Sequence, residues 1–176
     1  AVALILLVLT PFLPATATQV EYLAVEALGS DTPVVVRGEV TNVSAYWNEG
    51  STRILTETTV RVDERFKRAP AREVRIVQMG GELDGVRMTV AGALQWIPGE
   101  DVVLFLQDSM PGRYRVAGFS QGKFGIRTDP DSGEEFVVQA SLGAAELVGA
   151  ARSAQPDRMR LGDLLQRALP QIYEGE

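Results

Sequence analysis

The sequence predicts a mainly β protein: a small antiparallel β-barrel or sandwich, preceded by a short N-terminal helix and followed by C-terminal helices. Between residues 34 and 139, apolar residues recur at every second position, and turn residues divide this stretch into about eight short strands. Before and after it, the apolar residues have helical spacing. Short strands at regular spacing are typical of barrels and sandwiches.

Residues 1–17 have the pattern of an export signal. The apolar run AVALILLVL is followed by Pro11 and Pro14, and the segment ends in Ala15-Thr16-Ala17, a small-x-small cleavage pattern. The alternative is an uncleaved membrane anchor, for which the run is short against about 30 Å of hydrocarbon. We expect export to a bacterial periplasm or exterior, with membrane association if residues 1–17 are retained. The absence of cysteine favours a bacterial compartment over a disulfide-rich secretory route.

Residues 18–139 form the predicted barrel domain, which begins with a helix over TQVEYLAVEAL at residues 18–28. The expected strands are residues 34–47, 53–66, 73–79, 86–92, 102–107, 113–119, 121–128 and 134–139. VVLFLQ, at 102–107, is apolar at both alternating sets of positions, so it should be the most buried strand. Residues 140–176 form a helical C-terminal extension, with apolar spacing over 141–152 and 160–173 and a linker at Pro156.

Composition excludes several kinds of chemistry. The chain has no histidine and no cysteine, so it has no Ser-His-Asp triad, histidine-ligated metal, disulfide or thiolate zinc site. Its net charge of -6 disfavours binding to nucleic acid, whose phosphates would repel it.

The stretch VQMGGELDGVRM, at residues 77–88, resembles a phosphate-binding loop in its glycine content. Such a loop leads into a helix, whose N-terminal N–H groups bind the anion. Here the residues after Gly85 are strand-like, and Glu82 and Asp84 would repel phosphate. The stretch is therefore interpreted as a glycine turn between two strands.

Two acidic patterns suggest other sites. Asp129, Asp131 and Glu134 are spaced so that they could surround a calcium ion, although a plain β-turn explains the same residues. The adjacent pairs Asp63/Glu64, Glu100/Asp101 and Glu134/Glu135 suggest a carboxylate-dependent hydrolase. Neighbours on a strand point to opposite faces, however, so adjacency alone does not make a catalytic dyad.

Aromatic residues at strand ends are the candidates for binding a protein partner. Core capping by large aromatic side chains is the alternative. The turn SQGKF also places polar residues between two phenylalanines, which suits either a surface site or a glycine hairpin with aromatic anchors. The candidate partner-binding residues are Trp47, Trp96, Phe119, Gln121, Lys123 and Phe124.

These segments resemble a group of small exported bacterial proteins of uncharacterised function over roughly residues 19–139. The resemblance is carried by Gly38, Val40, Trp47, Gly80, Gly81, Val90, Gly92, Gly99, Glu100, Phe105, Gln121, Gly122, Lys123 and Phe124. The strand order is also similar to OB-like and netrin-like barrels. Netrin-like protease inhibitors reach a metal with an N-terminal cysteine, which this chain lacks.

The sequence thus predicts an exported, non-enzymatic binding or scaffold domain that contacts another protein and needs no cofactor. One alternative is an exported protease inhibitor acting through a loop of the barrel. The other is the carboxylate-dependent hydrolase.

Overall fold

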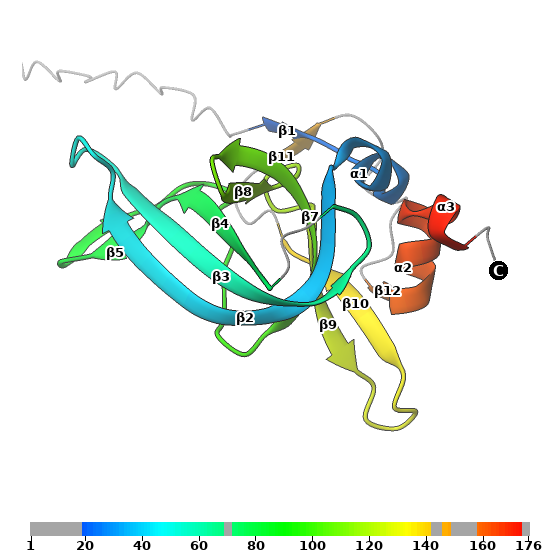
Figure 1. Ribbon diagram of the computed structural model, residues 1–176. Helices are drawn as coiled ribbons and strands as arrows, with labels where there is room; N and C mark the ends of the chain where they lie inside the picture. Colours follow the sequence, from blue (N-terminus) through cyan, green and yellow to red (C-terminus); the bar gives the residue numbers. More distant parts are fainter. Residues whose placement is uncertain (1–18, 69–71, 142–145, 149–157, 174–176) are drawn as a thin grey trace, which may run out of the picture.

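The computed structural model describes residues 19–68, 72–141, 146–148 and 158–173 (Figure 1). The predicted signal segment, residues 1–17, lies outside the described residues. The strands are β1 (Gln19–Glu21), β2 (Val34–Trp47), β3 (Ile54–Arg65), β4 (Glu73–Met79), β5 (Gly81–Leu83), β6 (Val86–Met88), β7 (Asp101–Met110), β8 (Arg113–Val116), β9 (Lys123–Thr128), β10 (Glu135–Gln139), β11 (Glu146–Val148) and β12 (Arg158–Arg160). The helices are α1 (Val25–Asp31), α2 (Leu161–Ala168) and α3 (Pro170–Tyr173).

Five strands close into a ring in the order β2-β3-β4-β8-β7, with β7 pairing back onto β2. The neighbours in this ring are antiparallel except β4 and β8, which run parallel and pair at Ile76 and Tyr114. The expectation of a wholly antiparallel sheet is therefore wrong at this seam. The reason is topological: β8 returns from the β7 hairpin in the same direction as β4, and it closes the ring there.

The sheet continues from β7 through β9 and β10 to β12, on the side of the molecule that carries α1 and α2 (Figure 1). This arrangement creates two apolar cores. One fills the ring and contains Val36, Val60, Leu104 and their neighbours. The other lies between the extended sheet and the helices.

Strands β2 and β7 contribute to both cores, because alternate side chains point to opposite faces of a strand. Val34 and Leu104 belong to the ring core, while Val35 and Phe105 belong to the helix-side core. All five residues from Val102 to Leu106 are buried. The prediction that VVLFLQ is a strand buried on both faces is confirmed for these residues.

The glycine-rich stretch is a hairpin, as expected. β5 and β6 pair antiparallel around Asp84 and Gly85, whose φ values of 51° and 77° both lie in the left-handed region. Two such residues suit the tight turn of a hairpin. The expected strand at residues 86–92 is shorter, because β6 ends at Met88 and pairs with β5 alone rather than with the main sheet.

Both ends of the domain differ in part from the helical prediction. Residues 19–21 form β1, and the helix α1 begins later, at Val25. Within the expected helix at 141–152, residues 146–148 instead form β11, which pairs in parallel with β1. The predicted C-terminal helix is confirmed as α2, which contacts α1. Among the described residues, no helix is long and apolar enough to cross a membrane.

Candidate functional site

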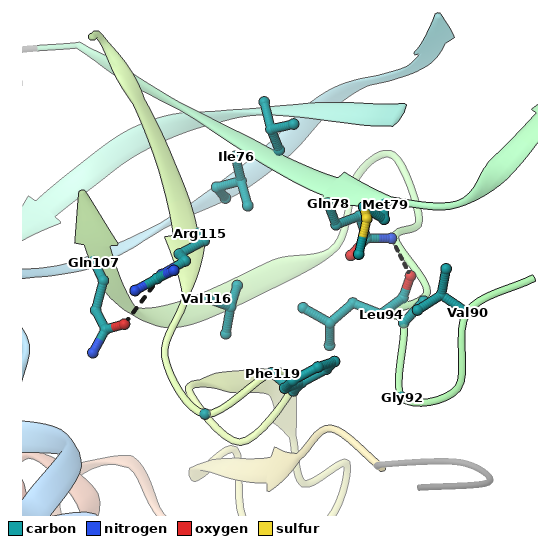
Figure 2. A pocket seen from close by; sticks show the side chains of 13 residues that line it. Ile76, Gln78, Met79, Val90, Gly92, Leu94, Gln107, Arg115, Val116 and Phe119 are labelled. Carbon is teal, nitrogen blue, oxygen red and sulfur yellow. Dashed lines mark hydrogen bonds between the residues drawn. The ribbon is translucent and has the colours of Figure 1, made fainter. Parts of the chain in front are cut away.

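A cavity opens in the barrel wall where β4 and β8 separate (Figure 2). β4 pairs with β3 along its whole length, but its pairing with β8 consists of Ile76 with Tyr114. The cavity has a volume of about 400 Å³, within the range of about 300–1,000 Å³ usual for ligand sites. We call it the seam pocket; its lining consists of residues 76–79 and 92–94, Val90, Gln107, Arg115, Val116, Gly118 and Phe119.

The lining comes from both faces of the barrel wall. Ile76, Leu94 and Val116 belong to the ring core. Met79 and Arg115 are exposed on the outer surface. The seam pocket therefore reaches from the surface to the core, and its lining is mostly apolar.

Phe119 is the residue of the pocket whose backbone is strained. Its φ is 65°, in the left-handed region, and its side chain is 49% exposed. The other non-glycine residues of the described chain with such φ values are the small polar turn residues Ser51 and Asp84. A bulky residue in this region is an outlier, and the conformation costs about 1–2 kcal/mol. The turn thus holds a half-exposed aromatic ring beside the cavity (Figure 2).

The opposite wall is held in place by Gln78. Its amide nitrogen donates to the Leu94 carbonyl at 2.9 Å, as Figure 2 shows, and its amide oxygen accepts from Trp96 Nε1 at 3.2 Å. These bonds tie the segment after β6 to β4. Trp96 packs against the ring core, so this predicted partner-binding residue positions the wall rather than lining the cavity.

The charge at the rim is positive. Arg115 Nε donates to Gln107 Oε1 at 3.3 Å, and Arg53 donates to the Met79 sulfur at 3.9 Å. Most arginines in the described part of the chain form salt bridges, whereas Arg115 and Arg53 form none with the carboxylates described. The pocket can therefore accept an apolar group and, at its edge, a negative charge.

The turn residues Gln121, Lys123 and Phe124 lie inside the protein. All three are buried. Gln121 accepts from the Leu23 N–H at 2.8 Å and donates to the Glu21 carbonyl at 2.8 Å, which fixes the segment before α1. The expectation that these three residues form a partner-binding surface is therefore corrected. Phe119, which precedes the SQGKF turn, is the candidate from this region that is exposed.

Lys123 forms a buried ion pair instead. Its Nζ lies 2.7 Å from Glu100 Oε2 and donates to the Gln95 carbonyl at 2.7 Å. The ammonium also sits 4.6 Å from the centre of the Trp96 ring. Trp47, the remaining aromatic candidate, is partly buried at the end of β2 opposite Ile54 and does not line the seam pocket.

The calcium candidates belong to the β9–β10 turn. Asp129 Oδ1 accepts from the N–H groups of Asp131 and Ser132 at 3.0 and 3.1 Å, and Oδ2 bonds Arg158 at 2.8 Å. The bond from Arg158 and those backbone N–H groups lower the pKa of Asp129 to about 2. Over the described residues, no cluster of three or more acidic groups could hold a metal ion. The geometry is that of a hairpin turn stabilised by its own aspartate.

Glu134 and Glu135 line a second depression of about 450 Å³. Glu135 bonds Arg37, and this hydrogen bond raises the pKa of Arg37 above its ordinary value. Glu134 lies 3.2 Å from Arg160. The two carboxylates thus form separate ion pairs, each with a different arginine. The adjacent acids elsewhere also form separate ion pairs, Asp63 with Arg61 and Glu100 with Lys123.

Sequence reasoning missed Met79 and Arg115 as pocket residues. One signal was present in β4. Its outward positions are charged at Glu73 and Arg75 and become apolar at Val77 and Met79. An outer face that turns apolar over its last residues is a sign that something covers it or binds there.

Comparison with models of protein families finds no match, and comparison with curated protein sequences finds no significant match. The seam pocket must therefore be interpreted from its own geometry.

Proposed function

We propose that this chain is an exported, non-catalytic binding domain, which holds a protein partner by an apolar side chain inserted into the seam pocket. The lining contains no aspartate, glutamate, serine, threonine, tyrosine or lysine, so it lacks the usual groups for acid–base or nucleophilic chemistry. It does combine apolar walls with a few polar groups at the rim, which is the usual composition of a binding pocket.

The observation that carries this proposal is Phe119. A residue needed only for the geometry of this turn could be glycine, which adopts positive φ without strain. Phenylalanine here combines an unfavourable backbone with a ring that remains 49% exposed. Strain of this kind concentrates at sites of function. Met79, 46% exposed, adds a flexible apolar side chain to the same pocket.

The fold supports a binding role in a more general way. The ring order β2-β3-β4-β8-β7, with a parallel β4–β8 seam, is consistent with the proposed OB-like barrel. Barrels of that type serve many ligands by varying their loops, so fold alone does not name the ligand. The apolar segment at residues 1–17 supports export, and with it a partner in the cell envelope or outside the cell.

The test is selection of peptides from a random linear display library by the purified protein, in parallel with Phe119→Gly. This variant removes the ring and relieves the left-handed strain, so we expect its stability to be maintained or raised by about 1 kcal/mol. We expect peptides to be enriched by the wild type and lost with the variant. Thermal denaturation of both proteins would show that the loss of binding does not come from unfolding.

Ile97→Ser is the matched control, because Ile97 is a large apolar residue with 61% exposure outside the seam pocket. Peptides selected by the wild type should bind this control with unchanged affinity. Equal enrichment by the wild type and Phe119→Gly, or no enrichment by either, would refute a binding role for the pocket.

A further inference from the structure

We propose that the seam pocket recognises an extended acidic segment of a partner protein. The segment adds as a strand to the open edge of β4, seats an apolar side chain in the cavity and places a carboxylate, two positions away, against Arg115. This inference rests on the proposed binding function and specifies the chemistry of the partner.

The first argument is the hydrogen-bonding direction of β4. At the two ends of its pairing with β3, the Gly80 N–H donates to the Ile54 carbonyl at 2.9 Å and the Val62 N–H donates to the Arg72 carbonyl at 2.8 Å. Even-numbered residues of β4 therefore direct their backbone groups toward β3. By the alternation of an antiparallel ladder, the backbone groups of Val77 and Met79 point the other way, toward β8.

β8 does not accompany β4 far enough to pair with Met79. The two strands pair at Ile76 and Tyr114, and β8 ends two residues later, at Val116, before the turn that carries Phe119. The outward N–H and C=O groups at Met79 thus face the seam pocket. An open strand edge is a template for strand addition, in which backbone bonds contribute affinity and pockets select side chains.

The second argument is charge. The protein as a whole carries a net charge of -6, yet Arg115 lines the pocket and Arg53 reaches Met79. Neither guanidinium has a salt bridge to a carboxylate in the described chain. By contrast, Arg113, which is on the same strand as Arg115, has its Nε 2.6 Å from Glu57 Oε2. A carboxylate on the partner would complete this site with a charge-assisted hydrogen bond.

The apolar group and the carboxylate must lie at a defined spacing along the partner segment. In an extended strand, residues i and i+2 lie on the same face about 6.6 Å apart, whereas i and i+1 point to opposite faces. An apolar side chain that enters the cavity from the outer face, where Arg115 is exposed, must therefore be two positions away from a carboxylate that reaches Arg115. Peptides with the acid directly beside the apolar residue should bind more weakly.

The experiment begins with the peptides selected by the wild-type protein. We expect them to share an aromatic or large aliphatic residue with Asp or Glu two positions away. A synthetic peptide of this pattern, titrated by fluorescence polarisation, should bind roughly three- to tenfold more weakly to Arg115→Glu. The same peptide with Lys in place of the acid should bind more tightly to Arg115→Glu than to the wild-type protein. The matched control is Arg87→Glu, which changes an exposed arginine on the β5–β6 hairpin. This variant should bind both peptides as the wild-type protein does.

Strand addition has its own readout. Methylating single backbone nitrogens of the peptide removes one donor at a time. Because an added strand bonds its neighbour at alternate residues, every second methylation should reduce binding by tenfold or more, and the intervening ones should have little effect. Uniform tolerance of methylation would overturn strand addition.

The outcomes separate this inference from the function on which it rests. Peptides that depend on Phe119 but lack a shared acid, or that are indifferent to Arg115→Glu, would overturn the inference and leave the binding function standing. Failure to select any Phe119-dependent peptide would overturn both. Displacement of a selected peptide by a simple fatty acid at lower concentration would identify a lipid site and also overturn the inference.

Discussion

Replacing Lys123 with methionine should destabilise the protein substantially. Lys123 and Glu100 are 6% and 9% exposed, with 2.7 Å between Nζ and Oε2. Methionine keeps the length of the side chain but leaves Glu100 buried without its main partner. Breaking a buried ion pair in this way costs about 3–5 kcal/mol. We expect the lower end, because Arg127 remains 3.7 Å from the other oxygen of Glu100.

Urea denaturation measures this loss. With a slope m of about 2 kcal/mol/M, a loss of about 3 kcal/mol lowers the midpoint by roughly 1.5 M while the slope stays unchanged. Arg87→Met is the control, since Arg87 and Glu82 form a pair that is 74% and 58% exposed and whose loss should cost at most about 1 kcal/mol. The double variant Lys123→Met/Glu100→Leu should recover much of the stability, because it removes both charges. The reasoning is refuted if Lys123→Met costs no more than Arg87→Met.

Two further predictions concern the helices and the β9–β10 turn. A Cβ on Gly29 would lie 1.7 Å from the Ala168 carbonyl oxygen, so Gly29→Ala should destabilise the packing of α1 on α2 by about 1–3 kcal/mol. Gly162→Ala, with no atom nearby, should be neutral or stabilising by up to about 1 kcal/mol in a thermal melt. The pKa of Asp129 is about 2, below the ordinary 3.8, so its stabilising contribution should be complete above pH 4 and lost as pH falls toward 2. A carboxyl NMR titration should give that midpoint, and Arg158→Ala should raise it; a midpoint unchanged by that substitution would contradict the assigned cause.

Local patterns predicted the parts of the fold that local chemistry determines. The alternation in β3 buries Thr56, Thr58 and Val60 on one face, as its period of two requires. The Asp84-Gly85 turn followed from residues that tolerate positive φ. In both cases, the information lies within a few neighbouring residues.

The errors arose where distant segments decide the structure. Residues 146–148 have helical spacing in the sequence, yet they are a strand because β1, more than a hundred residues earlier, supplies the edge on which they pair. The polar residues of SQGKF look like an exposed turn. Gln121 and Lys123 are nevertheless buried, because Glu21, Leu23 and Glu100 satisfy hydrogen bonds of their side chains from elsewhere in the chain. Tertiary context of this kind overrides local propensity.

The candidate site was predictable only in part for the same reason. Phe119 was among the residues expected to bind a partner, because an aromatic residue stood beside a glycine turn. The cavity beside it depends on the divergence of β4 from β8, two strands well separated in sequence. No local pattern records the distance over which two remote strands remain paired.

The buried residues behind Phe119 bear on its proposed role. Within its turn, the Gly122 N–H donates to the Ala117 carbonyl at 2.9 Å and the Gln121 N–H donates to the Gly118 carbonyl at 3.2 Å. The Gln121 side chain adds bonds to the segment before α1. A turn held from both sides cannot relax the φ of Phe119 by shifting as a whole. The backbone that carries the ring is therefore preorganised, and a partner of the proposed kind would not have to supply the free energy needed to order it. In the proposed role, Gln121 would position Phe119 without touching the partner itself.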